Sequence, residues 1–181
     1  HGTYAAGRRK ASIGIYDLDT VKPPFMYEAL LPEGISFIPL EERVRMNGKE
    51  VLEKTLKGRE YASILEGLPR YPLLSDSQGN TLSMPPIINS DETRVRLGTK
   101  NLFIDVTGTS EQSINLCLNV VVTSLLERGG RYGRVEVTFP ERRLKTPRMD
   151  WTSLPLHLEA VRRGSGLERD SVSVRALLDR M

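Results

Sequence analysis

Residues 101–130 read NLFIDVTGTSEQSINLCLNVVVTSLLERGG and join a strand pattern to a helix pattern. Up to Gly108 the side chains alternate, with Leu102, Ile104 and Val106 on one face and Phe103, Asp105 and Thr107 on the other. Beyond it, apolar residues recur at helical spacing, Ser110 is placed to cap the helix, and Gly129-Gly130 ends it. The chain is therefore expected to carry Asp105 and Thr107 on one strand face, directly before a long helix.

Further strands are indicated on both sides of this unit. KASIGIY (10–16) alternates apolar with polar or small residues, and GISFIPL (34–40) is expected to be a second strand stopped by Pro39. Two short apolar runs joined by SDSQGN (75–80) predict a hairpin. Pro85-Pro86 cannot donate backbone hydrogen bonds, so the chain must leave the sheet there. RVEVTFP (134–140) predicts one more strand.

Three shorter helices are expected. NGKEVLEKTLKG (47–58) has an apolar side, with Asn47 as N-cap and Gly58 as C-terminal stop. Residues 60–65 and 171–181 also have helical patterns. The stretch 141–147 is expected to be a linker, which divides the chain into residues 1–140 and a tail, 141–181, too short for a core of normal size.

Composition limits the class of protein. The chain has 181 residues, 39% hydrophobic and 27% charged, which is typical of a folded globular protein. No apolar run approaches the roughly 20 residues that a membrane helix needs. The single cysteine, Cys117, excludes an internal disulfide and favours a reducing, cytoplasmic compartment. One cysteine and two distant histidines form no zinc-ligand spacing, so no metal site is expected.

Charge is distributed unevenly along the chain. From Gly130 onward there are 11 Lys or Arg against 7 Asp or Glu, a net +4, which leaves −1 for the rest of a chain with net charge +3. A basic tail favours contact with phosphate, and a solvated charged surface is the alternative. The first residues, HGTY, lack a start methionine, so the chain is expected to be a segment of a longer one.

Four blocks carry a family resemblance: GRRKASIGIYDLD (7–19), LKGREYASIL (56–65), YPLLSDSQGNTLSMPPIINSDETRV (71–95) and TKNLFIDVTGT (99–109). Residues 7–140 resemble the editing module, B3/B4, of phenylalanyl-tRNA synthetase beta subunits of the archaeal and eukaryotic type. LKTPRMDW (144–151) and the terminal RALLDRM are similar to the start of the following domain, B5. The resemblance implies a three-layer α+β module of mixed or antiparallel sheets with packed helices.

The same resemblance implies an activity and partners. The module would hydrolyse the ester in tyrosine-charged tRNA(Phe), a product of mistaken aminoacylation. It needs no cofactor, because ATP and magnesium would belong to the full synthetase, whose aminoacylation site lies on the alpha subunit. A site that hydrogen-bonds the phenol hydroxyl rejects phenylalanine, since its polar groups would go unpaired. A non-catalytic structural or tRNA-docking module of the same beta subunit is the alternative function.

Site residues carried over from the resemblance are Asp105, Thr107 and Ser83 as catalytic groups, and Leu73, Leu74, Asn89 and Gly108 as substrate-binding groups. Asp105 or Thr107 would bind the phenol or orient a water, and Ser83 would offer a hydroxyl. A leucine side chain would pack against the ring of the substrate tyrosine. Asn89 and the amides near Gly108 would hold the terminal adenosine or the carbonyl oxygen.

Each of these residues also has a purely structural interpretation. Asp105 could anchor a turn or pair with an arginine, Ser83 and Asn89 could shape a loop, and the two leucines suit a core. The chain also departs from the family pattern at Ser110, where an acidic residue usually follows TGT. Serine substitutes well for a helix-capping acid but not for one that touches substrate. No residue is an obvious general base.

Overall fold

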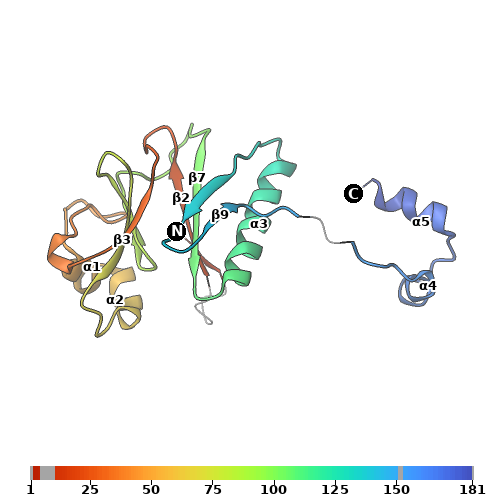
Figure 1. Ribbon diagram of the computed structural model, residues 1–181, viewed down its shortest axis with the longest axis horizontal. Helices are drawn as coiled ribbons and strands as arrows, with labels where there is room; N and C mark the ends of the chain where they lie inside the picture. The colour runs from red at the N-terminus through yellow and green to blue at the C-terminus, as the bar shows by residue number, and fades with distance from the viewer. Residues whose placement is uncertain (1, 5–10, 151–152, 181) are drawn as a thin grey trace. The chain divides into compact units, whose positions relative to one another are not determined.

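The computed structural model in Figure 1 describes residues 2–4, 11–150 and 153–180 and divides into two compact units. The division falls between Arg148 and Met149, eight residues beyond the boundary expected from the sequence. The reason is that residues Arg143–Thr146, expected to be linker, form strand β9 and pair with β8, Val135–Thr138. The assignment of the two parts to editing domain and B5 start stays a prediction.

Two antiparallel sheets form the centre of the first unit. One has the strand order β1-β2-β7, with bounds Gly2–Tyr4, Ala11–Asp17 and Leu102–Gly108. The other has the order β3-β4-β5-β6, with bounds Met26–Leu30, Tyr71–Ser75, Thr81–Met84 and Ile88–Asn89. The predicted hairpin is thus β4 and β5, and the strand ends before Pro85-Pro86 as expected.

Helices cover the outer faces of both sheets (Figure 1). Helix α3, Glu111–Glu127, packs on β7 and β2, and the Ser110 hydroxyl caps it by accepting from the Ser113 amide at 3.3 Å. On the other side lie η2, Pro32–Gly34; α1, Gly48–Lys54; α2, Leu56–Tyr61; and η3, Ala62–Ile64. The α+β class with antiparallel sheets is confirmed, and helices lie on the outer face of each sheet.

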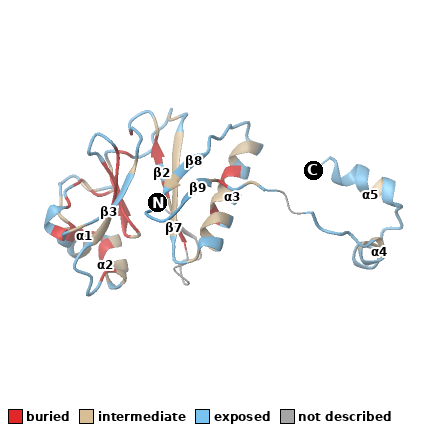
Figure 2. Ribbon diagram, in the orientation of Figure 1, coloured by how far each residue is buried: buried red, intermediate tan, exposed pale blue. Residues whose placement is uncertain are grey.

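The β3–β6 sheet separates two apolar clusters. On its helix side, Leu73 and Met84 pack with Val51 of α1. On its other side, Leu74 packs with Tyr16 of β2 and with Leu82. Adjacent residues of one strand thus face opposite layers, as strand geometry requires. Figure 2 shows buried residues gathered in this sheet and in β2.

The second unit has helices α4, Leu158–Ser165, and α5, Ser171–Leu178. None of its described residues is buried. Helix α4 has no counterpart in the sequence patterns noted above. The tail therefore forms helices without enclosing a core of its own.

Two expected elements are wrong. Residues 34–40 form no strand but only isolated bridges, Phe37 to Met46 and Pro39 to Ser90, while the strand β3 lies earlier, at Met26–Leu30. The expected helix 47–58 is capped by Asn47 as predicted but breaks at Thr55, whose hydroxyl caps α2. Gly58 is not a stop: it lies inside α2, where a Cβ would overlap the Val51 carbonyl oxygen of α1.

Asp76 organises the hairpin turn between β4 and β5. Its fully buried carboxylate accepts hydrogen bonds from the amides of Lys22, Gln78 and Asn80 and from the Asn80 side chain, at 2.8–3.0 Å. Burial alone would raise the pKa of Asp76, but the hydrogen bonds outweigh it and hold the pKa below its usual value. The turn also ties the hairpin to the loop that follows β2.

We predict that Asp76→Ala destabilises the fold by about 3 kcal/mol or more, because four donors lose a charged acceptor. Because the folded-state pKa of Asp76 is depressed, the stability that its carboxylate contributes is fully present above about pH 4. This stability is lost as the pH falls through the folded-state pKa. Urea unfolding from pH 3 to 8 measures it. Ser77→Ala, which removes one exposed hydrogen bond to the Lys22 carbonyl, is the control and should change stability by less than about 1 kcal/mol. An equal effect of both variants would contradict this role.

Candidate functional site

The pairing of β2 with β7 creates a polar strand face. Ser12 is opposite Thr107, Gly14 opposite Asp105, and Tyr16 opposite Phe103. These residues alternate with the branched apolar ones that lie toward α3, so the polar set faces the β3–β6 sheet. The predicted shared face of Asp105 and Thr107 is confirmed, and it points into the space between the sheets.

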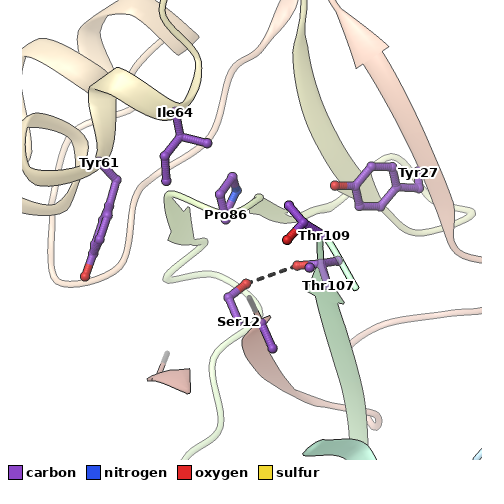
Figure 3. A pocket seen from close by; sticks show the side chains of 9 residues that line it. Ser12, Tyr27, Tyr61, Ile64, Pro86, Thr107 and Thr109 are labelled. Carbon is purple, nitrogen blue, oxygen red and sulfur yellow. Dashed lines mark hydrogen bonds between the residues drawn. The ribbon is translucent and has the colours of Figure 1, made fainter. Parts of the chain in front are cut away.

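A cavity of about 440 Å³ opens at one end of this space (Figure 3). Its lining comes from both sheets and from the helix layer: Ala11, Ser12, Tyr27, Tyr61, Ile64, Pro86, Thr107, Gly108 and Thr109. The Ser12 and Thr107 hydroxyls lie 3.0 Å apart and form a hydrogen bond across the strands. The volume and the mix of apolar and polar groups suit a small ligand or the end of a larger one.

Beside the cavity, polar groups meet without satisfying one another. The Tyr16 hydroxyl and the Ser83 hydroxyl are both buried and lack a well-formed hydrogen bond within the described residues, although they are near neighbours. Burial, and then the charge of Asp105, raise the pKa of Tyr16 well above its usual value. The same two causes raise the pKa of Tyr27 to about 12. Asp105 therefore lies within electrostatic reach of both phenols.

Asp105 is a half-buried carboxylate without a partner. It accepts no hydrogen bond and forms no ion pair within the described part of the chain. Burial raises its pKa to about 6. Natural proteins rarely leave buried polar groups unpaired, and such groups concentrate where a ligand supplies the missing partner.

Gly14 makes room for this arrangement. The Tyr16 side chain folds back over Gly14, and a Cβ there would overlap the Tyr16 hydroxyl oxygen. The ring of Tyr16 is fixed by Phe103, whose ring centroid is 6.0 Å away. The Tyr16 hydroxyl is thereby held next to Asp105, the strand partner of Gly14.

The predicted site residues divide into three groups. Thr107 and Gly108 line the cavity. Ser83, Leu74 and Asp105 surround Tyr16 beside the cavity and do not line it. Ser83 and Asp105 thus occupy one inter-sheet space, with the Tyr16 hydroxyl in range of both.

Leu73 and Asn89 lie outside both places. Leu73 faces the helix-side core with Met84. Asn89 is buried on β6 as the strand partner of Ser83 but is not part of the cavity lining. The alternation of β4 explains the first case, because Leu73 and Leu74 cannot face the same layer.

Sequence patterns missed the aromatic residues of the site. Tyr16 stood in a predicted strand and Pro86 in a predicted break, but neither was assigned to the site. Tyr27 lies on the strand that the patterns misplaced, and Tyr61 ends α2, a helix whose bounds were misjudged. The signal available was Gly14-Ile15-Tyr16, since a glycine two residues before a tyrosine leaves room for the ring on the same strand face.

Two features are absent from the residues that the structure describes. There is no group of three or more His, Cys, Asp or Glu placed to hold a metal ion. Likewise, among the helices of the described ranges none is both long and apolar enough to cross a membrane.

The known proteins that this chain resembles are subunits of an aminoacyl-tRNA synthetase. Each of these relatives is the beta subunit of phenylalanyl-tRNA synthetase, also named phenylalanine–tRNA ligase. The chain is 47% identical over 180 residues to the beta subunit of Pyrococcus furiosus, covering 99% of this chain and 32% of the relative. The chain is 44% identical to the beta subunit of Thermococcus kodakarensis, covering 99% of this chain and 31% of the relative. No family model matches.

A solved structure agrees with the sequence relatives. The N-terminal fragment of the phenylalanyl-tRNA synthetase beta subunit from Pyrococcus horikoshii has a TM-score of 0.86 and 44% identity, covering 96% of this chain and 50% of that one. The chain is therefore homologous over its whole length to one segment of these beta subunits. It spans about a third of the length of the curated relatives.

The raised pKa of Asp105 predicts a pH-dependent stability. In the unfolded chain this carboxyl ionises near pH 4, and in the folded chain near pH 6. Stability is therefore lost as the pH rises through this window and the penalty is complete above it. Asp105→Asn should be more stable than wild type by about 1–3 kcal/mol at pH 8 and equal to it at pH 4. Urea unfolding at both pH values measures this.

Asp19→Asn is the control, because Asp19 is exposed and its carboxylate accepts a single hydrogen bond within the described residues, from the Asn101 side chain. It should show no such gain at pH 8. A loss of stability in Asp105→Asn at pH 8 would contradict the assignment, because it would mean that the carboxylate has a stabilising partner.

Proposed function

We propose that this chain is the editing part of a phenylalanyl-tRNA synthetase beta subunit and hydrolyses the ester of tyrosine-charged tRNA(Phe). The observation that carries the proposal is the carboxylate of Asp105, which has no hydrogen-bond or ion-pair partner among the described residues, beside a cavity that Thr107 and Gly108 line. Two further hydroxyls, on Tyr16 and Ser83, lie in the same space and have no well-formed hydrogen bond among the described residues. Together they form a polar end that a hydroxyl-bearing ligand can complete.

The polar end explains how tyrosine is told from phenylalanine. A phenol that reaches Asp105 donates the hydrogen bond that this carboxylate lacks. Phenylalanine enters the same space but leaves the carboxylate unpaired. Sites built to bind a hydroxyl reject the analogue without it by about 10⁴- to 10⁵-fold. An apolar pocket alone distinguishes the two side chains only weakly.

The distance from the cavity to Asp105 follows from the strand geometry. Thr107 lines the cavity, and Asp105 lies two residues further along the same strand face, about 7 Å away. Tyr27 lines the cavity and also interacts electrostatically with Asp105, so its phenol lies where the cavity meets the space around Asp105. The aromatic ring of the substrate enters from the cavity, and its hydroxyl meets the carboxylate.

The ester then lies near the cavity-lining hydroxyls and amides. The bonded pair of Ser12 and Thr107 can position the attacking water, and the backbone around Gly108 can donate to the developing oxyanion. In the full enzyme the partners are tRNA(Phe) and the alpha subunit, in the cytoplasm, and ATP and magnesium serve aminoacylation there. The editing region itself uses no cofactor.

The test measures tyrosine and phenylalanine release from charged tRNA(Phe), by the chain and by the full two-subunit enzyme. Wild type should release tyrosine and much less phenylalanine. Asp105→Ala should reduce tyrosine release by about 100-fold or more. Because the carboxylate acts in its ionised form, release should fall as the pH drops below about 6. No tyrosine release by the intact enzyme would refute the proposal.

Thr107 gives a second, independent measure. Thr107→Ala removes the partner of Ser12 and should lower the rate, whereas Thr107→Ser keeps the hydroxyl and should retain most of it. Folding and tRNA affinity should be unchanged in each variant. If tRNA affinity falls while release per bound tRNA is unchanged, the docking alternative is favoured over the esterase.

A further inference from the structure

The cavity has a second wall that tyrosine recognition does not use. Tyr61 ends α2, Ile64 belongs to η3, and Pro86 follows the break after β5. All three side chains are half-buried and line the cavity across from the strand ends (Figure 3). This wall is aromatic and aliphatic, whereas the β2–β7 wall carries hydroxyls.

The order of residues along β7 places this wall at the outer end of the site. Asp105 and Thr107 lie about 7 Å apart on β7, and Thr109 follows just beyond the end of the strand at Gly108. The cavity is lined by Thr107 and Thr109 but not by Asp105. With the phenol at Asp105 and the ester near Thr107, the group beyond the ester must lie toward Thr109, across from Tyr61.

We propose that Tyr61 stacks on the adenine of the 3′-terminal adenosine of tRNA, with Ile64 and Pro86 packing against the base. This inference rests on the proposed function, because the ester joins the amino acid to that nucleoside. Stacking on aromatic side chains is a common way for proteins to hold unpaired bases. The wall takes over the adenosine-binding role first expected for Asn89, which does not line the cavity.

Charge near the wall suits a nucleic acid. The Lys57 ammonium lies 5.3 Å from the centroid of the Tyr61 ring, and the Lys57 side chain is 44% exposed. It also pairs with Glu60 at 3.1 Å, a surface ion pair that holds it only weakly. A cation in this place can meet the phosphate that precedes the terminal nucleoside.

The test compares Tyr61→Ala and Tyr61→Phe on two substrates in the full two-subunit enzyme. On tyrosine-charged tRNA(Phe), Tyr61→Ala should raise KM by about 10- to 100-fold with little change in kcat, and Tyr61→Phe should stay near wild type. On tyrosine ethyl ester, which has no base, both variants should match wild type. Tyr132→Ala is the matched control, because Tyr132 is exposed and outside the cavity lining.

A direct binding measurement separates this inference from the proposed function. A non-hydrolysable 3′-tyrosylamino-adenosine should bind Tyr61→Ala at least about 10-fold more weakly than wild type in calorimetry. If the wild type binds this probe through Tyr61 but releases no tyrosine, the base site is supported and the proposed esterase function is refuted. Equal losses of Tyr61→Ala on both ester substrates, or no loss on either, would overturn the base site.

Discussion

The antiparallel register between β2 and β7 is the constraint on which the site depends. It places Gly14 opposite Asp105 and Ser12 opposite Thr107, with Ser12, Asp105 and Thr107 on the face toward the second sheet. A slip of one residue would turn this set toward α3 and bring the branched apolar residues into the space between the sheets. The register is held because each face has its own layer to fit, helix on one side and sheet on the other.

Stability and function place opposite demands on the side chains between the two sheets. Tyr16 and Ser83 keep hydroxyls buried without well-formed hydrogen bonds, and Asp105 keeps a carboxylate whose burial raises its pKa to about 6. A sequence selected for stability alone would pair or remove such groups. The apolar cluster around Tyr16, Leu74 and Leu82 supplies the packing that tolerates them. The Asp76 turn, where every oxygen is used, shows how the same chain satisfies a purely structural carboxylate.

Local patterns predicted the parts whose physics is local. The alternation of β7, the Ser110 cap of α3 and the turn at Asp76 each depend on a few neighbouring residues. The failures have one cause in common. Strand β3 was missed because only pairing with β4 makes Met26–Leu30 extended, and Gly58 was misread because α1 lies against it. Neither partner is visible from the segment itself.

The sequence by itself determined which strand carries Asp105 and Thr107, that they share a face, and that a capped helix follows, because these depend on residue spacing and neighbouring side chains. Its resemblance to beta subunits of phenylalanyl-tRNA synthetase also stands on residues alone. Only the tertiary structure decided what surrounds that face. Tyr27 and Tyr61 line one cavity and Tyr16 lies beside it, from three separate segments, because sheet stacking and helix packing unite residues that are distant along the chain.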